Sequence, residues 1–378
     1  MSDFDRIAYI REDININFKV PVYVQEYIDI INEGIQNKDL DRYSEGVDSM
    51  DHLAKMAAIQ GCITDYQCTA LRKKWGLQMS VLDSVIKEAS LPDISNWEIN
   101  YGANYTGRSC TKAGLFNPQG IKYMVKIEDN IKEKILNAGL SYSNTPITEH
   151  LGCKIFDTLG IKVQSTFLCS YKGKMAVACK DFTTTEKQLV EYSQFKLNNP
   201  EFNEYSSTNA LSNDFVKQIE FLDRFSAKYF NIKERFWRTF ILDALIGNGD
   251  RTDNNQAFLG SYKGLSLAPV YDCGAGLNPN WSLDKMQKFL DTDDKSMYVH
   301  KARTCCYTIK DKLVNPYKVI REGVYEDCKK ALIWFLDNSN NLDFEKIVNH
   351  EVLFASQVQK DFYVELLKER LEFLISCY

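Results

Sequence analysis

One short polar segment constrains this chain more than any other. Residues 247–255 read GNGDRTDNN, and residues 270–274 read VYDCG. Phosphoryl transfer uses such a set: one Asp orients the attacking hydroxyl and accepts its proton, while an Asn and a second Asp hold the magnesium ions that bridge the ATP phosphates. The spacing from Asp250 to Asn255 equals that from the catalytic Asp to the metal-binding Asn in the protein-kinase catalytic loop. We therefore interpret Asp250 as the catalytic base, and Asn255 and Asp272 as metal ligands.

The flanking residues predict how the segment folds. Residues 233–246 have apolar side chains at helical spacing, and Gly247 then ends the helix. Residues 256–259 and 265–270 are expected to form two short strands around a Lys-Gly turn, with Asp272 after the second. Asp, Asn and Gly are also the residues of ordinary turns and caps. Two types of metal ligand at this spacing, closed by a strand-end Asp, favour the site over a plain turn.

The strings LIGNGDRTDNNQAFL and LAPVYDCGAGLNP also resemble the C-terminal signature of the HipA-like Ser/Thr protein kinases, toxin kinases of the HipA and CtkA type. The resemblance covers roughly residues 96–378. It implies a two-lobed kinase fold, the cofactors ATP and Mg²⁺, and phosphorylation of protein Ser/Thr. The family often has a His two residues after the catalytic Asp, where this chain has Thr252.

The expected fold is accordingly α+β, with a small β-rich ATP lobe and a larger helical lobe, preceded by an extra helical region. We assign residues 1–95 to the N-terminal helical region, 96–182 to the kinase N-lobe and 183–378 to the C-lobe. The last of these ends in a long amphipathic helix over residues 357–377.

A kinase N-lobe needs a strand lysine to neutralise phosphate charge, and a helix Glu to hold that lysine. Residues 120–127 alternate as a strand does, and Lys126 lies near its end. A helix is then predicted from Thr145, as N-cap, to about Leu159. Glu149 in its first turns matches the family's Glu, although an acid there could simply favour the helix N-terminus. We interpret Lys126 and Glu149 as the phosphate clamp, and His150 as a helix-surface residue.

Small, polar and basic residues between 102 and 114 form the candidate phosphate loop, because they can lay backbone N–H groups along phosphates. A plain surface loop is the alternative, and the position before the lysine strand favours the phosphate role. The residues assigned to ATP in this loop are Gly107, Arg108, Ser109 and Lys112. In HipA-like kinases this loop can carry an autophosphorylated Ser, and the candidates here are Ser109, Thr106 and Thr111.

The hinge between the lobes is expected after a hairpin formed by residues 163–170 and 174–179. Kinase hinges bind adenine mainly through backbone groups, and many relatives place an acid nearby for the ribose. Lys180 and Asp181 are therefore included among the ATP-binding residues.

The N-terminal region predicts helices over residues 24–35, 49–60 with Asp48 as cap, and 65–75 with Thr64 as cap. A helix-turn-helix with a basic second helix would suggest DNA binding, since Arg72, Lys73 and Lys74 lie in the third helix. We favour a small helical bundle with a solvated basic face, and we do not expect direct DNA binding.

Composition excludes several other functions. A net charge of −5 argues against non-specific nucleic-acid binding as the main role. No run of eighteen apolar residues predicts a membrane span. The eleven cysteines show no metal spacing and the start lacks the features of a signal peptide, so we expect reduced thiols in the cytoplasm. The four histidines form no zinc motif.

Two classes of function remain open from the residues. The first is a protein Ser/Thr kinase, with an unidentified protein substrate and possible control by an antitoxin-type regulator. The second is a regulatory pseudokinase that partners a DNA-binding antitoxin. Because none of the catalytic residues is missing, the sequence favours the enzyme. A small-molecule kinase or nucleotidyltransferase on the same fold is the third candidate.

Overall fold

The computed structural model describes residues 10, 14–75, 91–102, 111–128, 143–207, 213–299 and 306–378. These fall into two compact units, one holding the described residues as far as Leu91 with Ser143, the other comprising Pro92–Glu128 and Asn144–Tyr378. Each unit is described by itself.

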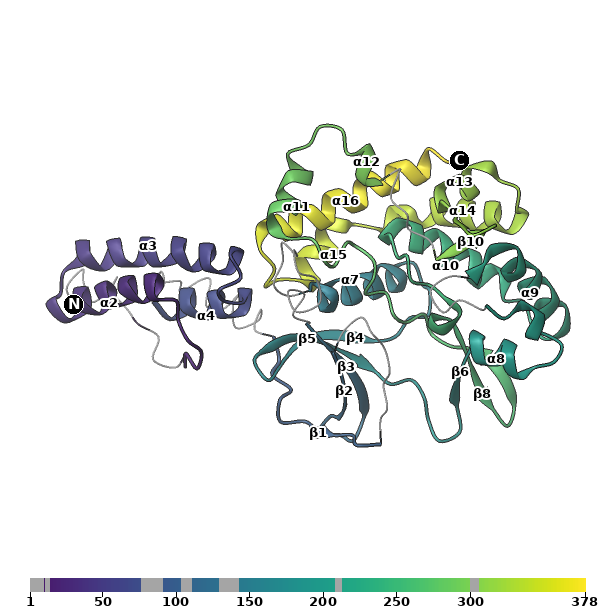
Figure 1. Cartoon of the computed structure of the whole chain (residues 1–378), viewed down its shortest axis with the longest axis horizontal. Coiled ribbons are helices and arrows are strands. Elements are labelled where there is room, and N and C mark those ends of the chain that lie inside the picture. The colour runs from purple at the N-terminus through teal and green to yellow at the C-terminus, as the bar shows by residue number, and fades with distance from the viewer. Residues whose placement is uncertain are drawn as a thin grey trace. The chain divides into compact units, whose positions relative to one another are not determined.

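The described part of the first unit is a helical bundle (Figure 1). Its helices are α2 (Val22–Asn37), α3 (Leu40–Ile59) and α4 (Asp65–Trp75). Their apolar faces share one core, formed by Val24, Ile28, Ile31, Tyr43, Val47, Met50, Ala54, Ala57, Ile63, Cys68, Leu71 and Trp75. Helix α3 corrects the sequence prediction: it begins eight residues before Asp48, and the Asp39 side chain accepts the capping bond from Arg42 N. Thr64 caps α4 as predicted, accepting from Gln67 N.

The basic end of α4 is engaged within the unit. Arg72 pairs with Asp51 on α3. Lys74 Nζ donates to the Ile14 carbonyl at 2.7 Å and lies over the Trp75 ring. These contacts fit the helical-bundle interpretation better than a helix presented to DNA.

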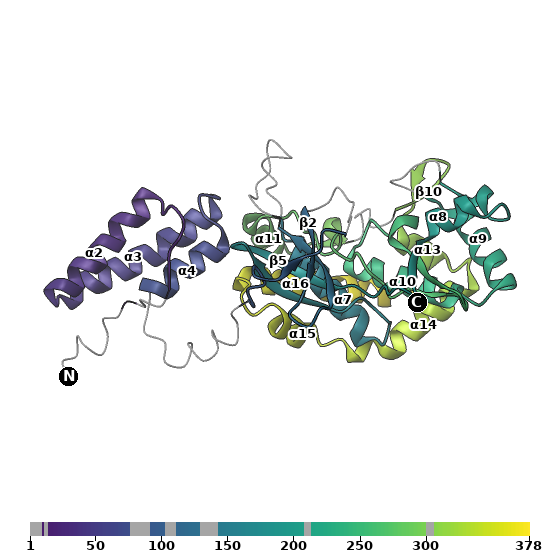
Figure 2. The same ribbon diagram turned by 90° about the horizontal axis from the view of Figure 1, so that it is seen from below.

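The second unit begins with an antiparallel sheet of five strands in the order β1-β2-β3-β5-β4. The strands are β1 (Glu98–Ile99), β2 (Thr111–Phe116), β3 (Lys122–Ile127), β4 (Thr166–Tyr171) and β5 (Lys174–Lys180). The β4–β5 hairpin turns through Lys172 and Gly173, both at positive φ, as the predicted turn requires. Helix α7 (Thr145–Thr158) lies along this sheet, between it and the C-terminal helices (Figures 1 and 2). Its N-cap is Asn144 rather than Thr145, a shift of one residue from the prediction.

The rest of the second unit is mainly helical. Its helices are α8 (Tyr192–Asn198), α9 (Phe215–Lys228), α10 (Lys233–Ile246), α11 (Leu283–Leu290), α12 (Ser296–Val299), α13 (Pro316–Glu322), α14 (Glu326–Asn338), α15 (Phe344–Glu351) and α16 (Gln357–Ile375). Two small sheets complete it, formed by β6 (Gln188–Glu191), β8 (Ala257–Ser261) and β9 (Gly264–Leu267), and by β7 (Asn213–Asp214), β10 (Tyr307–Ile309) and β11 (Lys312–Leu313). A β-rich part followed by a helical part is the expected α+β, kinase-like architecture.

Helix α10 positions the candidate site and has the predicted bounds. Most of its side chains are buried, and Gly247 ends it in the left-handed region at φ 70°. A stack of aromatic rings supports the neighbouring elements, with Phe225 of α9 lying 4.6 Å from Phe258 of β8 between ring centroids. The loop after Gly247 therefore follows a helix whose side chains are mostly buried.

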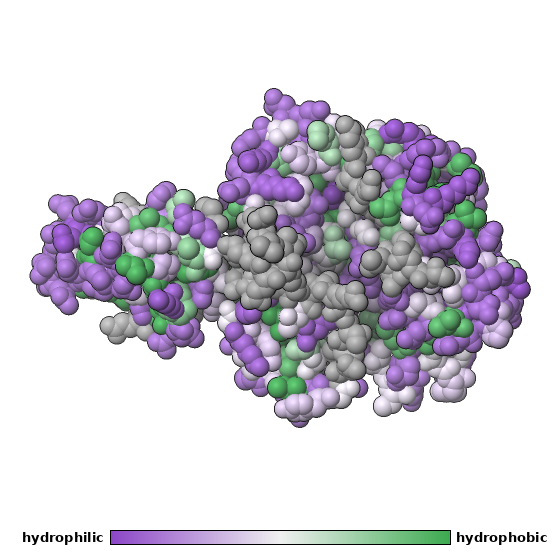
Figure 3. Space-filling view, viewed as in Figure 1, coloured by the Kyte–Doolittle hydropathy of each residue, from purple (hydrophilic) through white to green (hydrophobic). Residues whose placement is uncertain are grey.

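The described surface is mixed. In Figure 3 polar residues predominate on the visible face, with apolar residues scattered among them. None of the described helices has the length and apolar character needed to cross a membrane.

We predict that Gly34→Ala destabilises the first unit. Alanine favours helices over glycine, so propensity alone predicts a gain of about 1 kcal/mol. A Cβ at Gly34, however, would lie 2.6 Å from Tyr43 N, a backbone atom of α3 that cannot rotate away. We expect a net loss of about 1–3 kcal/mol, as overpacking causes, measured as faster amide exchange in α2 and α3. Slower or unchanged exchange would contradict the close contact.

Candidate functional site

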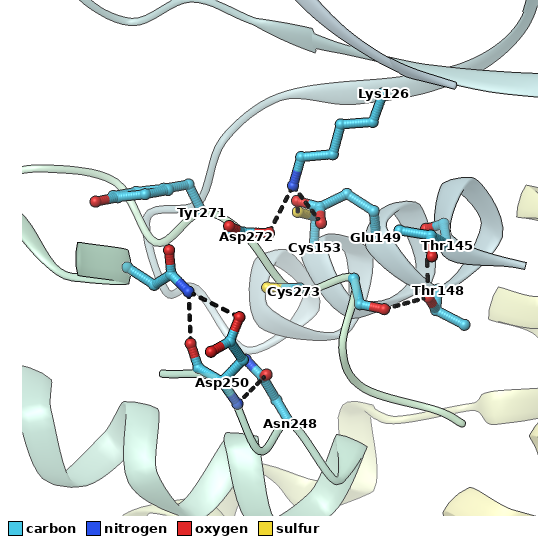
Figure 4. Close-up of polar contacts among 12 residues, drawn as sticks. Lys126, Thr145, Thr148, Glu149, Cys153, Asn248, Asp250, Tyr271, Asp272 and Cys273 are labelled. Carbon is cyan, nitrogen blue, oxygen red and sulfur yellow. Dashed lines mark hydrogen bonds and ion pairs between the residues drawn. The ribbon is translucent and has the colours of Figure 1, made fainter. Parts of the chain in front are cut away.

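Lys126 forms the centre of the candidate site. Its Nζ donates to Glu149 Oε2 at 2.7 Å and to Asp272 Oδ1 at 2.8 Å (Figure 4). The side chains of Lys126 and Glu149 are 1% and 0% exposed, whereas Asp272 keeps 24% exposure. The structure thus brings together a strand lysine, a helix glutamate and the acid after β9, which the sequence separates by up to 146 positions.

The Lys126 ammonium and the Asp272 carboxylate favour each other's charged forms. Burial alone would lower the pKa of the Lys126 ammonium, but the carboxylates of Asp272 and Glu149 hold that pKa well above its ordinary value. Burial raises the pKa of Asp272, yet the Lys126 charge and hydrogen bond outweigh it, so the pKa is lowered overall. Asp272 is therefore an anion at neutral pH, as a metal ligand must be.

Two glycines allow residues 272–274 (Asp-Cys-Gly) to lie against α7. A Cβ at Gly274 would meet Glu149 Oε2 at 2.8 Å, and one at Gly152 would meet Cys273 Cβ at 2.7 Å. Thr148 Oγ1 donates to the Gly274 carbonyl at 2.8 Å. Asp272 itself has a φ of 56°, a left-handed conformation that costs a non-glycine residue about 1–2 kcal/mol. Such strain is common where a side chain must be aimed at a site.

Asp250 and Asn255 face each other across their loop. Asn255 Nδ2 donates to the Asp250 carbonyl at 2.6 Å and to Asp250 Oδ2 at 3.3 Å. Asn248 Oδ1 accepts from Asp250 N at 3.1 Å. Because the Asn255 amide nitrogen is the atom so engaged, its oxygen is the atom that would hold a metal.

The electrostatics of Asp250 suit a proton acceptor. Asp250 is exposed to solvent, but the surrounding protein removes part of the water around its carboxylate. This partial desolvation, and then the like charge of Asp272, raise the pKa of Asp250 above its ordinary value. Arg251, Asn255 and Lys126 oppose this rise. A raised carboxylate pKa makes a stronger base.

Sequence reasoning missed Arg251, which anchors the loop. Its guanidinium forms a fork with both carboxylate oxygens of Asp243 on α10, at 2.9 and 3.1 Å. It also donates to the carbonyls of Tyr271 and Asn255 and contacts Cys273 Sγ. One buried cation thus joins α10, the Asp250 loop and the Asp272 segment. A lone acid in the apolar run FILDALI was the available signal, because a buried carboxylate requires a partner.

A second buried pair holds the middle of the loop. Lys196 Nζ of α8 donates to Asp253 Oδ2 at 2.7 Å and to Gln218 Oε1 at 2.7 Å, and both charged side chains are nearly fully buried. Asp253 lies between Asp250 and Asn255, so this contact fixes the turn that sets their spacing. No sequence pattern had indicated it.

Of the other predicted ATP-binding residues, the structure describes Lys112, Lys180 and Asp181. Lys112 on β2 is the register partner of Lys126, and its charge acts on Asp272. Lys180 ends β5 with an exposed side chain, and its N–H donates to Ser165 O. Asp181 N donates to Lys122 O, while Asp181 Oδ1 accepts from Thr183. Gly107, Arg108, Ser109 and Thr106 fall outside the described residues, and Thr111 begins β2.

His150 corrects a prediction. It is 3% exposed and hydrogen-bonded through both ring nitrogens, so it is not a helix-surface residue. Helical periodicity gave the wrong prediction for His150 because α7 is buried on both sides, by the sheet and by the C-terminal helices.

No group of three or more His, Cys, Asp or Glu side chains in the described ranges could enclose a metal ion. An open pair of one carboxylate and one amide is nevertheless what magnesium uses when nucleotide phosphates supply the remaining ligands. The donor set of Asp272 and Asn255 therefore fits Mg²⁺ carried by a nucleotide.

Comparison with known proteins identifies relatives of this chain. The family model of the HipA-like C-terminal domain matches residues 109–321. The serine/threonine-protein kinase CtkA of Helicobacter pylori (strain J99) is 32% identical over 286 residues, which cover 74% of this chain and 84% of that protein. The crystal structure of the H. pylori proinflammatory kinase CtkA aligns with a TM-score of 0.64 and 28% identity, covering 76% of this chain and 96% of that one.

We predict that Arg251→Met destabilises the second unit by about 3–5 kcal/mol, because it leaves the Asp243 carboxylate buried without its partner. Arg251→Lys should fall between this variant and the native protein, since an ammonium keeps the charge but cannot form the fork. Urea unfolding measures both. Lys318→Met is the control: its ion pair with Glu322 is 71% and 52% exposed, so we expect a loss below about 1 kcal/mol. Equal losses in Arg251→Met and Lys318→Met would refute the anchoring role.

We predict that Asp250→Asn raises the melting temperature of the nucleotide-free protein slightly. The folded pKa of Asp250 is raised, so its ionised form destabilises the fold; the penalty is full above that pKa and absent below the ordinary carboxyl pKa of about 4. Because the side chain is exposed, the gain at pH 7 should not exceed about 2 °C. The gain should vanish in acid, and Asp293→Asn in an exposed turn should show none. A lower melting temperature at pH 7 would contradict this.

Proposed function

Because the chain belongs to the family of HipA-like serine/threonine protein kinases, we propose that it transfers the γ-phosphoryl group of Mg²⁺-ATP to Ser or Thr hydroxyls of proteins, including its own. The observation that carries the proposal is the buried Lys126 ammonium, paired at once with Glu149 and Asp272. Protein kinases require both the lysine–glutamate pair and the metal-binding Asp in place.

Each residue then has a defined role. Asp250 orients the attacking hydroxyl and accepts its proton as the new oxygen–phosphorus bond forms and ADP leaves. Asp272 and Asn255 would hold the metal. Lys126 would hold the nucleotide phosphates, with Glu149 keeping its ammonium in place. When bound, the metal neutralises charge on the phosphates.

Autophosphorylation is proposed for the segment that leads into β2. Thr111 is exposed at the start of β2, next to Lys112, and Ser109 and Thr106 are the other candidates from the family resemblance. A phosphate beside Lys112 would add negative charge close to the nucleotide site and so change its affinity for ATP.

The finer assignments stay proposals. We propose the N-lobe as 96–182, the C-lobe as 183–378 and 1–95 as a helical region. The described cysteines are all free thiols, in keeping with the proposed cytoplasmic location. The protein substrate and an antitoxin-type regulator are predictions of the family resemblance. A pseudokinase is disfavoured because none of the expected catalytic residues is missing. Lys126 contacts Glu149 and Asp272, and Asn255 contacts Asp250.

We predict that incubation with Mg²⁺-ATP adds phosphate to the protein, whereas Asp250→Asn and Lys126→Met remain unmodified. Loss of the base or of the phosphate-binding cation should reduce transfer at least about 100-fold, the usual size of such contributions. Intact-mass spectrometry measures the gain, and peptide mapping locates it. Asp293→Asn is the matched control and should be modified like the native protein.

The outcomes separate the candidate functions. Phosphate added to the native protein, but not to Asp250→Asn or Lys126→Met, supports the kinase. A mass increase equal to a nucleotide would overturn the kinase proposal and indicate a nucleotidyltransferase. No modification of the protein or of casein-type test substrates, with ATP still bound, would favour the pseudokinase.

A further inference from the structure

The buried His150 joins helix α7 to two different parts of the second unit. Its Nε2–H donates to Glu351 Oε2 at 2.8 Å, since a carboxylate can only accept. Its Nδ1 lies 2.8 Å from the Thr166 hydroxyl on β4, which can donate or accept. Thr166 belongs to the sheet and Glu351 ends helix α15. Figure 1 shows α7 between these two layers.

Glu351 depends on partners from α7. As the last residue of α15 it lies at the negative end of the helix dipole, an unfavourable place for a carboxylate. Besides His150, its oxygens contact Lys154 Nζ at 3.4 Å and His350 Nδ1 at 3.1 Å. The hydrogen bond from His150, followed by that from His350, lowers the pKa of Glu351 to about 2, against the effect of burial. Its stabilisation is therefore present above the ordinary carboxyl pKa and is lost only as the pH falls towards 2.

The N-terminus of α7 has a second attachment to the C-terminal helices. Asn144 Oδ1 accepts from Gln359 Nε2 of α16 at 3.1 Å, and Asn144 Nδ2 donates to the Trp281 carbonyl at 3.2 Å. Gln359 is itself fixed, because it completes the capping box of α16 with Ser356. Helix α7 is thus held at its N-cap, Asn144, and again at His150, six residues later.

Glu149 and His150 are consecutive, so they point about 100° apart around the helix. One faces Lys126 and the other faces Glu351 and Thr166. A rotation of α7 that withdrew Glu149 from Lys126 would carry the His150 ring away from both partners. The lysine–glutamate pair and the His150 contacts are therefore made or lost together.

We propose that His150 and Glu351 are positioning residues, which latch helix α7 to the C-terminal helices in the orientation that pairs Glu149 with Lys126. The inference rests on the proposed function, because it gives that pairing a role in nucleotide binding. In protein kinases the pairing is controlled by the position of the corresponding helix.

The test compares Glu351→Ala, Glu351→Gln and Glu345→Ala. Glu351→Ala removes the acceptor of the His150 N–H, whereas Glu351→Gln keeps an oxygen that can accept it. Glu345→Ala is the control, because Glu345 lies on the same helix as Glu351 but forms an exposed ion pair with Lys368. Calorimetry with a non-hydrolysable Mg²⁺-ATP analogue gives the affinity. We expect Glu351→Ala to weaken binding roughly 2- to 30-fold, the range of coupling changes through an intermediate residue. Glu351→Gln should recover most of the affinity, and Glu345→Ala should match the native protein.

A second readout needs neither nucleotide nor activity. The acetylation rate of Lys126, measured by mass spectrometry, reports whether its buried ammonium has been released from Glu149. We expect faster acetylation of Lys126 in Glu351→Ala than in Glu345→Ala. Thr166→Val, nearly isosteric, should act in the same direction and serves if Glu351→Ala does not fold.

The two proposals fail separately. If the native protein binds no nucleotide, the proposed function is overturned, while the Lys126 acetylation rates still decide the latch. If Glu351→Ala and Thr166→Val leave both nucleotide affinity and Lys126 acetylation unchanged, the latch is overturned and the kinase proposal stands. Equal weakening by Glu351→Gln and Glu351→Ala would also contradict a role through the hydrogen bond.

Discussion

A buried ammonium must be paired, and the whole site depends on that requirement. Lys126 is almost fully buried in β3, where an unpaired charge would cost several kcal/mol. Its two carboxylate partners come from α7 and from the segment after β9, so the sheet, the helix and the helical part must meet at one point. Gly152 and Gly274 permit this meeting because a side chain at either position would occupy the space between α7 and the Asp272 segment. The cost of leaving a buried charge unpaired thus favours the arrangement that brings the proposed catalytic groups together.

Two further buried ion pairs hold the loop that carries Asp250. Arg251 holds the Asp250 loop on Asp243, and Lys196 holds its middle through Asp253. These pairs contribute little net stability over apolar residues of similar size, but breaking one would leave a charge stranded. They favour a single loop geometry, which a loop of Asp, Asn and Gly lacks by itself. Asp250 is exposed and Asn255 is half-buried, which suits their proposed contacts with substrate and metal.

Much of this site could be predicted because its chemistry is local in sequence. The Asp250–Asn255 spacing, the apolar helix before it and the strand lysine each follow from short patterns, and α10 and α4 have the predicted bounds. The helix expected after Asp48 began earlier because Asp39, not Asp48, supplies the cap. His150 was misplaced for a different reason: periodicity finds one buried face, and α7 is buried on several.

The sequence by itself determined the family and the fold class and indicated the proposed reacting groups, since these follow from residue types and their local spacing. Only the tertiary structure decided which distant charged or polar side chains pair. Lys126 with Asp272, Lys196 with Asp253 and His150 with Glu351 join residues 146, 57 and 201 positions apart. Those partners are selected by burial, because a charge removed from water must find its counterpart wherever the fold places one. No local pattern encodes that choice.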